Sequence, residues 1–268
     1  MALPVAETAW PYVVPDTRVL VVIPTYNEIE NIDEVLRRTR RALPEATVLV
    51  VDDNSPDGTG DRVVALQRSI GDLEVLRREG KQGLGAAYRA GFRAGLAQGY
   101  DVFIEMDADL SHDPAALPDL VRAIANGADL AIGSRYVRGG SAPDWARSRR
   151  AISKIGNTYA RAMLGLPVHD ATSGFRAYRA DVLRDIDLDR VQADGYGFQV
   201  EMAYQVHTMG GHITEVPIEF RDRTLGRSKM SMRIVVEALW LVTRWGARDR
   251  LHRTRPLVGA PRPVVSGE

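Results

Sequence analysis

The sequence of 268 residues contains no cysteine, which excludes thiol catalysis, zinc fingers, iron–sulfur clusters and disulfide-stabilised folds. It also lacks an uninterrupted apolar run of about 18 residues, the length that indicates a membrane-spanning helix. Aromatic residues make up only 7%, and the counts of Lys+Arg and Asp+Glu are both 35. A chain of this length buries enough surface to form a core without disulfides or a structural metal. The composition therefore indicates one globular domain, with room for an appendage.

The motifs of several enzyme classes are missing as well. The glycine cluster that begins Gly83-Leu84-Gly85 has Tyr88 where a dinucleotide-binding motif needs its third glycine, and no P-loop occurs. No serine nucleophile elbow and no HExxH-type histidine spacing are present. We therefore expect the glycine cluster to ease the start of a helix against a sheet, with backbone amides able to approach a ligand. The histidines, His112 among them, are predicted to be surface or structural residues.

Short runs rich in Val and Ile alternate with amphipathic segments, the pattern of an α/β protein with a mainly parallel sheet. Strands are expected at residues 19–23, 47–51, 73–76, 102–106 and 129–132. Helices are expected at residues 29–41, 61–70 and 84–97 and after the start signal Asp113-Pro114. The regular alternation ends after residue 135, where an Arg-rich loop and helix (138–164) and a turn-rich segment (170–176) follow. We expect this second half to receive a second substrate.

Four regions are expected along the chain: a flexible leader (1–17), the α/β domain (18–230), an amphipathic helix (231–255) and a disordered tail (256–268). The leader has no basic segment of the kind that begins a signal peptide. Residues 221–255 carry ten Arg or Lys against three acids, although the whole chain is neutral. A basic end indicates an anionic partner, either phosphates or a membrane surface.

Acidic residues follow two of the predicted strands, at the edge of the sheet where α/β proteins bind ligands. The pair Asp107-x-Asp109 offers oxygen ligands that suit Mg²⁺ or Mn²⁺ shared with a diphosphate, although two nearby acids are also common in loops. The pair Asp52-Asp53 follows the second strand. One of these two carboxylates is expected to accept hydrogen bonds from a base or ribose, and the other to cap the next turn with Asn54 and Ser55.

Six ordered segments together resemble the dolichol-phosphate (polyprenol-phosphate) mannose synthases, which are family 2 inverting glycosyltransferases with a GT-A fold. The segments are residues 23–28, 51–59, 106–112, 133–136, 172–176 and 223–229, and the resemblance extends from about Arg18 to Met232. It implies a GT-A, Rossmann-like nucleotide-diphospho-sugar transferase fold. It also implies transfer of mannose from GDP-mannose to a polyprenyl monophosphate with Mg²⁺ or Mn²⁺, giving polyprenyl phosphate β-mannose as a lipid-linked mannosyl donor.

The resemblance also implies roles for individual residues. Those that would hold the guanosine are Pro24, Tyr26, Glu28, Val51 and Asp53. Asp107 and Ala108 would line the nucleotide-sugar site, Asp109 would bind the metal, and Arg223 and Lys229 would close over the diphosphate. Ser111 is a second candidate ligand, because some relatives have Gln there as a metal neighbour. The positions that match an acceptor-phosphate site are Arg135, Arg149 and Ser153, with a register one residue later, at Arg150, left open.

The chemistry of the reaction agrees with the roles that the resemblance implies. A lipid monophosphate is already an anionic nucleophile at neutral pH, so its attack on an anomeric carbon needs no general base. The protein must instead gather positive charge on the leaving diphosphate, with Arg223 and Lys229, and on the attacking phosphate, with Arg135 and Arg149. In-line displacement between two such sites predicts inversion. The four residues expected to carry catalysis are Asp109, Arg135, Arg223 and Lys229.

The predicted C-terminal helix has a charged side and an apolar side. The charged side contains Arg233, Glu237, Arg244 and Arg248. Trp240 and Trp245 lie near the broad apolar side, as in a helix at a membrane interface or in one that packs on the domain's own core. Both interpretations remain open at this point. We expect peripheral attachment to the cytoplasmic face of a membrane, with or without an integral membrane partner protein, and no nucleic-acid partner.

Three other functions remain open from the sequence. The same reaction can be written with UDP-glucose or another nucleotide sugar, because the sequence does not distinguish guanine from uracil. A nucleotide-sugar-binding subunit without turnover is the second, and the intact acidic and basic motifs argue against it. A nucleotidyltransferase is the third, but it needs a glycine-rich loop where this chain has Pro24-Thr25-Tyr26.

Overall fold

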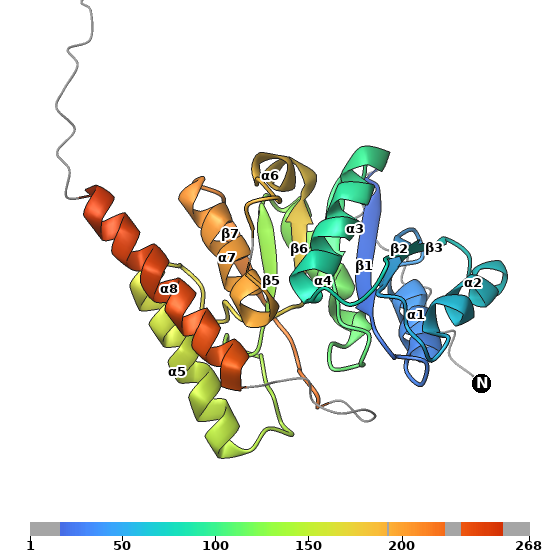
Figure 1. The fold of residues 1–268 in the computed structure, drawn as a ribbon, viewed down its shortest axis with the longest axis horizontal. Coiled ribbons are helices and arrows are strands. Elements are labelled where there is room, and N and C mark those ends of the chain that lie inside the picture. The colour runs from blue at the N-terminus through green and yellow to red at the C-terminus, as the bar shows by residue number, and fades with distance from the viewer. Residues whose placement is uncertain (1–16, 192, 223–231, 254–268) are drawn as a thin grey trace, which may run out of the picture.

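The computed structural model describes residues 17–191, 193–222 and 232–253, built around a seven-stranded sheet of order β3-β2-β1-β4-β6-β5-β7 (Figure 1). The strands are β1 (Val19–Thr25), β2 (Thr47–Asp52), β3 (Leu73–Arg77), β4 (Val102–Glu105), β5 (Leu130–Ser134), β6 (Arg176–Arg179) and β7 (Ile213–Pro217). Strand β6 runs antiparallel to its neighbours β4 and β5, and the other pairs of this sheet are parallel. The predicted α/β class with a mainly parallel sheet is confirmed.

Helices cover both faces of the sheet. One face carries α1 (Ile32–Ala42), α2 (Thr59–Ile70) and α4 (Leu117–Ala125), with the short 3-10 helix η1 (Pro114–Ala116) before α4. The other face carries α3 (Leu84–Gln98), α6 (Ala180–Asp185) and α7 (Gly195–Thr208). In β1, Val21 packs toward the first group of helices and Val22 toward the second, and both side chains are fully buried. This burial on both faces explains why the strand is a continuous apolar run.

Helix α3 approaches its neighbours through glycines. A Cβ at Gly91 would lie 2.5 Å from Val22 Cγ1, so this turn of the helix lies directly on the sheet. The sequence suggested that the glycine cluster at the start of α3 packs against the sheet. It instead packs against the segment that begins α7. A Cβ at Gly85 would lie 2.8 Å from the carbonyl oxygen of Ala193 and 2.9 Å from the ring of Phe198. The cluster therefore brings the first turn of α3 close to the first turn of α7.

Helices α5 (Arg147–Leu164) and α8 (Met232–Arg253) lie side by side at the β7 end of the sheet, next to α7 (Figure 1). Val242 of α8 is buried, and Trp245 stacks on Tyr204 of α7 with ring centroids 6.0 Å apart. One side of the helix expected over residues 231–255 thus packs on the domain, whereas Leu239 and Trp240 are exposed. No helix in the described ranges is long and apolar enough to span a membrane.

Candidate functional site

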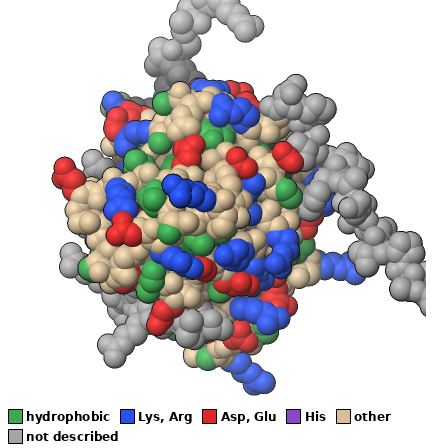
Figure 2. Space-filling view, turned by 90° about the vertical axis from the view of Figure 1, so that its right-hand side faces the viewer, with side chains coloured by type: hydrophobic (Ala, Val, Ile, Leu, Met, Phe, Trp, Pro, Cys, Tyr) green, Lys and Arg blue, Asp and Glu red, His purple; other side chains and the backbone are tan. Residues whose placement is uncertain are grey.

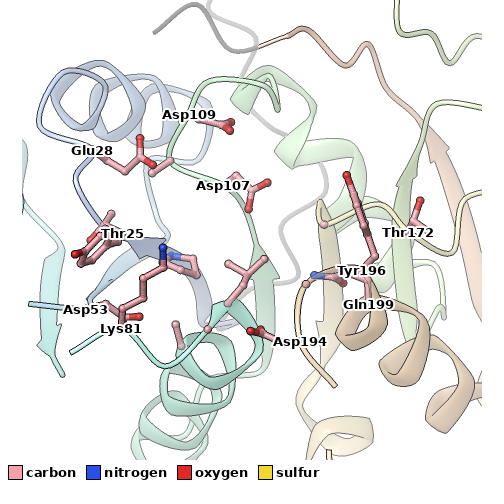
Figure 3. A pocket seen from close by; sticks show the side chains of 18 residues that line it. Thr25, Glu28, Asp53, Lys81, Asp107, Asp109, Thr172, Asp194, Tyr196 and Gln199 are labelled. Carbon is pink, nitrogen blue, oxygen red and sulfur yellow. The ribbon is translucent and has the colours of Figure 1, made fainter. Parts of the chain in front are cut away.

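Two adjoining cavities lie at the carboxyl ends of the central strands. The first has a volume of about 400 Å³ and is shown in Figure 3, and the second has a volume of about 340 Å³. Five residues line both cavities: Asp107, Asp109, Thr172, Gly174 and Tyr196. Because these residues belong to both walls, the two cavities meet there, and we call this place the junction.

The ends of β1 and β2 form one wall of the first cavity, and most residues predicted to hold a nucleotide lie in it. Pro24, Tyr26, Glu28 and Asp53 all line this cavity. Val51 does not: its side chain is fully buried in the core, where β2 packs against α3. The strand ends therefore gather four of the five residues expected around the guanosine.

One carboxylate of the pair Asp52-Asp53 caps the turn after β2, as the sequence suggested, and the other lines the first cavity. Asp52 accepts hydrogen bonds from the Thr25 hydroxyl at 3.0 Å and the Ser55 amide at 3.1 Å, so it caps the turn after β2. Asp53 lines the cavity, and its carboxylate lies 2.6 Å from the guanidinium of Arg78. Burial raises the pKa of Asp53, although the charge of Arg78 opposes this shift.

Lys81 is a residue of the first cavity that the sequence reasoning missed. Its Nζ lies 4.7 Å from the centre of the Tyr26 ring, and among the described lining residues it is the only basic one. The sequence did hold a signal, because the chain has only three lysines against 32 arginines. One of the three stands in the glycine-containing loop between β3 and α3, next to the edge of the sheet where ligands bind.

Asp107 and Asp109 lie just after β4, as predicted, and line both cavities. Asp109 is buried, and its Oδ1 accepts the Ser111 amide at 3.0 Å. Ser111, the second candidate ligand, lines only the second cavity. The described residues contain no group of three or more His, Asp or Glu that would hold a metal by themselves. Two carboxylates still fit Mg²⁺ or Mn²⁺, because such ions commonly use one or two protein carboxylates together with substrate phosphates and water.

His112 is buried and lines the second cavity. Its ring stacks on Phe175 with centroids 5.0 Å apart, and its Nδ1 accepts the Asp107 amide at 3.4 Å. Burial lowers the pKa of His112 to about 4, and the charge of Asp109 offsets only part of that shift. The ring is therefore neutral at pH 7. It supports the backbone of the acidic loop, which agrees with the structural role that the sequence suggested for the histidines.

Arg135 lies in the wall of the second cavity with its charge already paired. Its Nε and Nη2 donate to Asp170 at 2.7 and 2.6 Å, and the exposed fractions of the two side chains are 5% and 0%. The rings of Tyr136, Trp145 and Phe220 have their centres 4.9 to 5.5 Å from the guanidinium carbon. Arg135 is thus a fixed, pre-oriented group, a property that residue spacing alone does not reveal.

Arg149 also lines the second cavity, whereas Arg150 does not. The guanidinium of Arg149 lies 4.2 Å from the centre of the Trp145 ring and 2.6 Å from Asp222. Arg150 donates instead to the carbonyl of Ala142 at 2.7 Å. Of the two arginines between which the register was left open, only Arg149 thus reaches the wall of the second cavity.

Of the three remaining predicted residues, one lies outside both cavity walls and two are not among the residues that the structure describes. Ser153 accepts a hydrogen bond from the Tyr136 hydroxyl at 2.7 Å but is not a lining residue. Arg223 and Lys229 lie outside the described residues. The structure therefore neither supports nor opposes their predicted position over a diphosphate.

The start of α7 forms the wall opposite β1 and β2, and the sequence analysis did not identify it. Asp194, Gly195, Tyr196 and Gln199 line the first cavity from this side (Figure 3). The Oδ1 of Asp194 accepts the amide of Gly85 at 2.8 Å, which ties the beginning of α3 to the beginning of α7. A ligand in the first cavity would thus lie between the strand ends and α7.

Comparison with known proteins gives concordant results. The family model described as glycosyl transferase family 2 matches residues 20–187. The undecaprenyl-phosphate mannosyltransferase of Micrococcus luteus is 54% identical over 242 residues, covering 90% of this chain and 99% of that protein. The polyprenol monophosphomannose synthase of Mycolicibacterium smegmatis is 49% identical over 245 residues, covering 91% and 92%.

Among solved structures, glucosyl-3-phosphoglycerate synthase from Mycobacterium tuberculosis superposes with a TM-score of 0.67 at 21% identity, covering 87% of this chain and 81% of that one. The same synthase in complex with Mn²⁺ and UDP superposes with a TM-score of 0.61. At this identity the likeness shows the fold, and it confirms the predicted GT-A-like class.

Proposed function

The chain belongs to glycosyl transferase family 2, and on that basis we propose that it transfers mannose from GDP-mannose to a polyprenyl monophosphate with inversion. The observation that carries this proposal is the pair of cavities that meet at Asp107, Asp109 and Gly174. One cavity has the size and wall chemistry for a nucleotide sugar, and the other has two arginines for a phosphate. This arrangement suits a reaction that joins a sugar to a phosphate.

The nucleotide sugar would occupy the first cavity. Asp53, rigid beside Arg78, offers a carboxylate to ribose or base, and Lys81 supplies positive charge toward a diphosphate. Asp109 with Asp107, and Ser111 as a second candidate, would hold Mg²⁺ or Mn²⁺ between the protein and the diphosphate. Such an ion neutralises charge that develops on the leaving group. By resemblance, Arg223 and Lys229 add to that neutralisation.

The lipid phosphate would enter the second cavity. Arg149, oriented by Asp222 and Trp145, presents a guanidinium there, and Arg135 is fixed by Asp170. Because a phosphate monoester carries its own nucleophilic oxygen, this mechanism needs no general base. The low pKa of His112 makes it a weak base, and its Nδ1 already accepts the Asp107 amide, so it is not used as one. Binding energy and charge placement at the junction would supply the rate acceleration.

A lipid acceptor also requires contact with a membrane, and α5 and α8 offer the surface for it. Ile152 and Ile155 of α5 are 64% and 68% exposed, and Trp240 of α8 is 59% exposed. The far edge of the sheet, near α2 and β3, instead shows intermixed acidic and basic side chains with only small hydrophobic patches (Figure 2). We place the membrane against α5 and α8, as a peripheral attachment with or without an integral membrane partner.

The experiment that tests this function incubates the purified protein with Mg²⁺ and a short polyprenyl phosphate. GDP-mannose, UDP-glucose and UDP-GlcNAc are supplied in parallel, and sugar-lipid is detected by mass spectrometry. We expect product with GDP-mannose alone. Product only with a UDP-sugar would keep the two-cavity mechanism and overturn the mannose assignment. The absence of product with every donor, in liposomes as well as detergent, would contradict the catalytic role.

A further inference from the structure

The amide of Gln199 on α7 is a buried polar group without a hydrogen-bond partner. The side chain is 2% exposed, and neither Nε2 nor Oε1 makes a hydrogen bond with any described residue. Leaving such a group unsatisfied destabilises the fold, so buried amides are rarely left without a hydrogen bond in native proteins. Gln199 also lines the first cavity. A ligand in that cavity is therefore the natural partner for this amide.

The buried residues around Gln199, Arg176 and Glu105, do not hydrogen-bond its side-chain amide. Arg176, which is fully buried, uses its donors on the backbone carbonyls of Ala171, Ser173 and Gln199, each at 2.6 Å. Burial raises the pKa of Glu105 to about 7, and the nearby charge of Arg176 opposes this shift. No carboxylate–amide pair between Glu105 and Gln199 has hydrogen-bond geometry, since all four of their polar side-chain atoms lack a partner. Arg176 thus fixes the backbone at Gln199 while the side-chain amide remains available.

The side-chain amide of Gln199 lies close to Gly174. A Cβ placed on Gly174 would lie 3.5 Å from Gln199 Nε2 and 3.9 Å from Asp107 Oδ2. Gly174 lines both cavities, so the Gln199 amide and the Asp107 carboxylate face the same space at the junction. Figure 3 shows Gln199 on the side of the cavity opposite Thr25, Glu28 and Asp53. The amide is therefore far from the wall expected to hold the nucleoside.

The chemistry of an amide narrows the class of ligand. Gln offers a donor and an acceptor side by side, and both are unsatisfied here. A phosphate oxygen is an acceptor only and would leave Oε1 without a partner. A sugar hydroxyl both donates and accepts, so one or two hydroxyls satisfy the whole amide.

We propose that Gln199 is a specificity-determining residue that recognises a hydroxyl group of the donor sugar at the junction. This inference rests on the proposed transfer of a sugar from a nucleotide. It goes beyond that function because it assigns recognition of the sugar ring to α7, separately from recognition of the nucleoside by β1 and β2. Arg176 is then a positioning residue that holds the backbone of Gln199.

The test compares wild type with Gln199→Met, which keeps the side-chain length and removes the amide. We expect kcat/KM for GDP-mannose to fall about 10- to 100-fold, as for the loss of a buried hydrogen bond. The Kd for GDP, measured by calorimetry, should change less than about twofold, because GDP lacks the mannose ring that Gln199 would contact. Gln205→Met, on the same helix but outside both cavity linings, is the matched control and should keep wild-type values.

A second arm identifies the hydroxyl. Wild type and Gln199→Met are assayed with GDP-mannose and its singly deoxygenated analogues. One analogue should lose activity with wild type but lose little further with Gln199→Met, the coupling expected of contacting groups. An unchanged kcat/KM for Gln199→Met, an equal loss of GDP affinity, or additive losses for every analogue would overturn the inference. If Gln199→Met does not fold by circular dichroism, Gln199→Glu replaces it in both arms.

This design separates the inference from the proposed function. The wild-type enzyme is first assayed with GDP-mannose and UDP-glucose. If only UDP-glucose reacts, the mannose assignment fails, and the same cycle is run with deoxygenated glucose donors. If neither reacts, the proposed function has failed, and binding of GDP-mannose against GDP to wild type and Gln199→Met decides the inference: an affinity ratio equal in both proteins overturns it.

Discussion

Gly174 matters at the junction because it has no side chain. An added methyl group would make only ordinary contacts, at 3.5 Å or more, and would not force the backbone to shift. It would nevertheless stand in the space that both cavities share. We predict that Gly174→Ala folds normally but lowers kcat/KM about 10- to 100-fold, since small misplacements of reacting groups are costly.

Steady-state kinetics and thermal denaturation check this prediction together. Gly156→Ala is the control, because a Cβ at Gly156 meets no atom within 4 Å. Wild-type kcat/KM in Gly174→Ala would place the meeting point of the substrates somewhere else.

Asp109 tests whether the acidic motif acts in turnover or only in folding. Asn at this position keeps an oxygen that can accept the Ser111 amide, so the loop should be preserved while the charge is lost. We predict that Asp109→Asn reduces kcat by about 100-fold or more and shifts the Mg²⁺ or Mn²⁺ dependence to higher concentration. Asp119→Asn, an exposed acid of α4, is the control. Full transfer by Asp109→Asn would favour a binding subunit whose partner performs the chemistry.

The end of β5 is fastened by the buried pair Arg135 and Asp170. Asp170→Ala would leave the guanidinium of Arg135 buried without its counter-charge. We predict a loss of about 3–5 kcal/mol in the free energy of unfolding, measured by urea denaturation. Asp61→Ala breaks a pair with Arg77 in which both side chains are more than half exposed, and it should cost less than about 1 kcal/mol. Equal losses for the two variants would show that the buried pair does not hold this strand end in place.

The loops after β1 and β2 are joined by Asp57, and this contact should depend on pH. Burial tends to raise the pKa of Asp57, but hydrogen bonds from the Thr59 hydroxyl and from the Thr59 and Ile29 amides outweigh it and hold the pKa below its ordinary value. A lowered folded-state pKa means that the carboxylate stabilises the fold above its unfolded pKa of about 3.9. That contribution disappears as the pH falls through the folded-state pKa.

We therefore predict that Asp57→Asn lowers the free energy of unfolding at pH 7 by less than about 1 kcal/mol, because the group is exposed and screened. The difference from wild type should shrink as the pH falls below the unfolded pKa of about 3.9 and vanish once the carboxylate of the folded protein is protonated, when both proteins carry a neutral side chain. Urea titrations across this range measure it. If the difference in free energy of unfolding stayed constant with pH, the substitution would act through packing or hydrogen-bond geometry and not through the charge of Asp57.

The elements that the sequence predicted and those it missed differ in their burial. Strands β1 to β5 are short apolar runs between amphipathic helices, and periodicity identifies them. Helix α7 is buried on nearly every side, so it has no polar face to create a helical period. Strand β6 begins with Arg176, which is fully buried and donates to the carbonyl of Gln199, 23 residues further along the chain. Such a contact depends on tertiary structure and leaves no local pattern.

The candidate site was predictable where short motifs follow strands, as at Asp53 and Asp107. It was not predictable where its residues come from α7 or depend on pairing. Gln199 and Asp194 belong to no recognised motif, and only folding brings them opposite β1. The pairing of Arg135 with Asp170 spans 35 residues of sequence, so spacing did not reveal it.

At the scale of the whole molecule, the exposed apolar residues of α5 and α8 predict where a membrane binds. We predict that the double variant Ile152→Ser and Ile155→Ser reduces flotation with anionic liposomes, because it removes apolar area from the interface. Its turnover with a short, detergent-solubilised acceptor should remain close to wild type. Val64→Ser, on α2 at the opposite edge of the sheet, is the control, since Val64 is also exposed. Unchanged flotation of the double variant would place the membrane contact elsewhere or on a partner protein.

The proposed mechanism is a direct displacement between two cavities that meet at one point. The most direct test is the anomeric configuration of the mannosyl lipid made from GDP-α-mannose, determined from the one-bond C1–H1 coupling by NMR. In-line attack by the lipid phosphate predicts polyprenyl phosphate β-mannose. An α-linked product would contradict a single displacement at the junction and would require a covalent intermediate or a different approach of the acceptor.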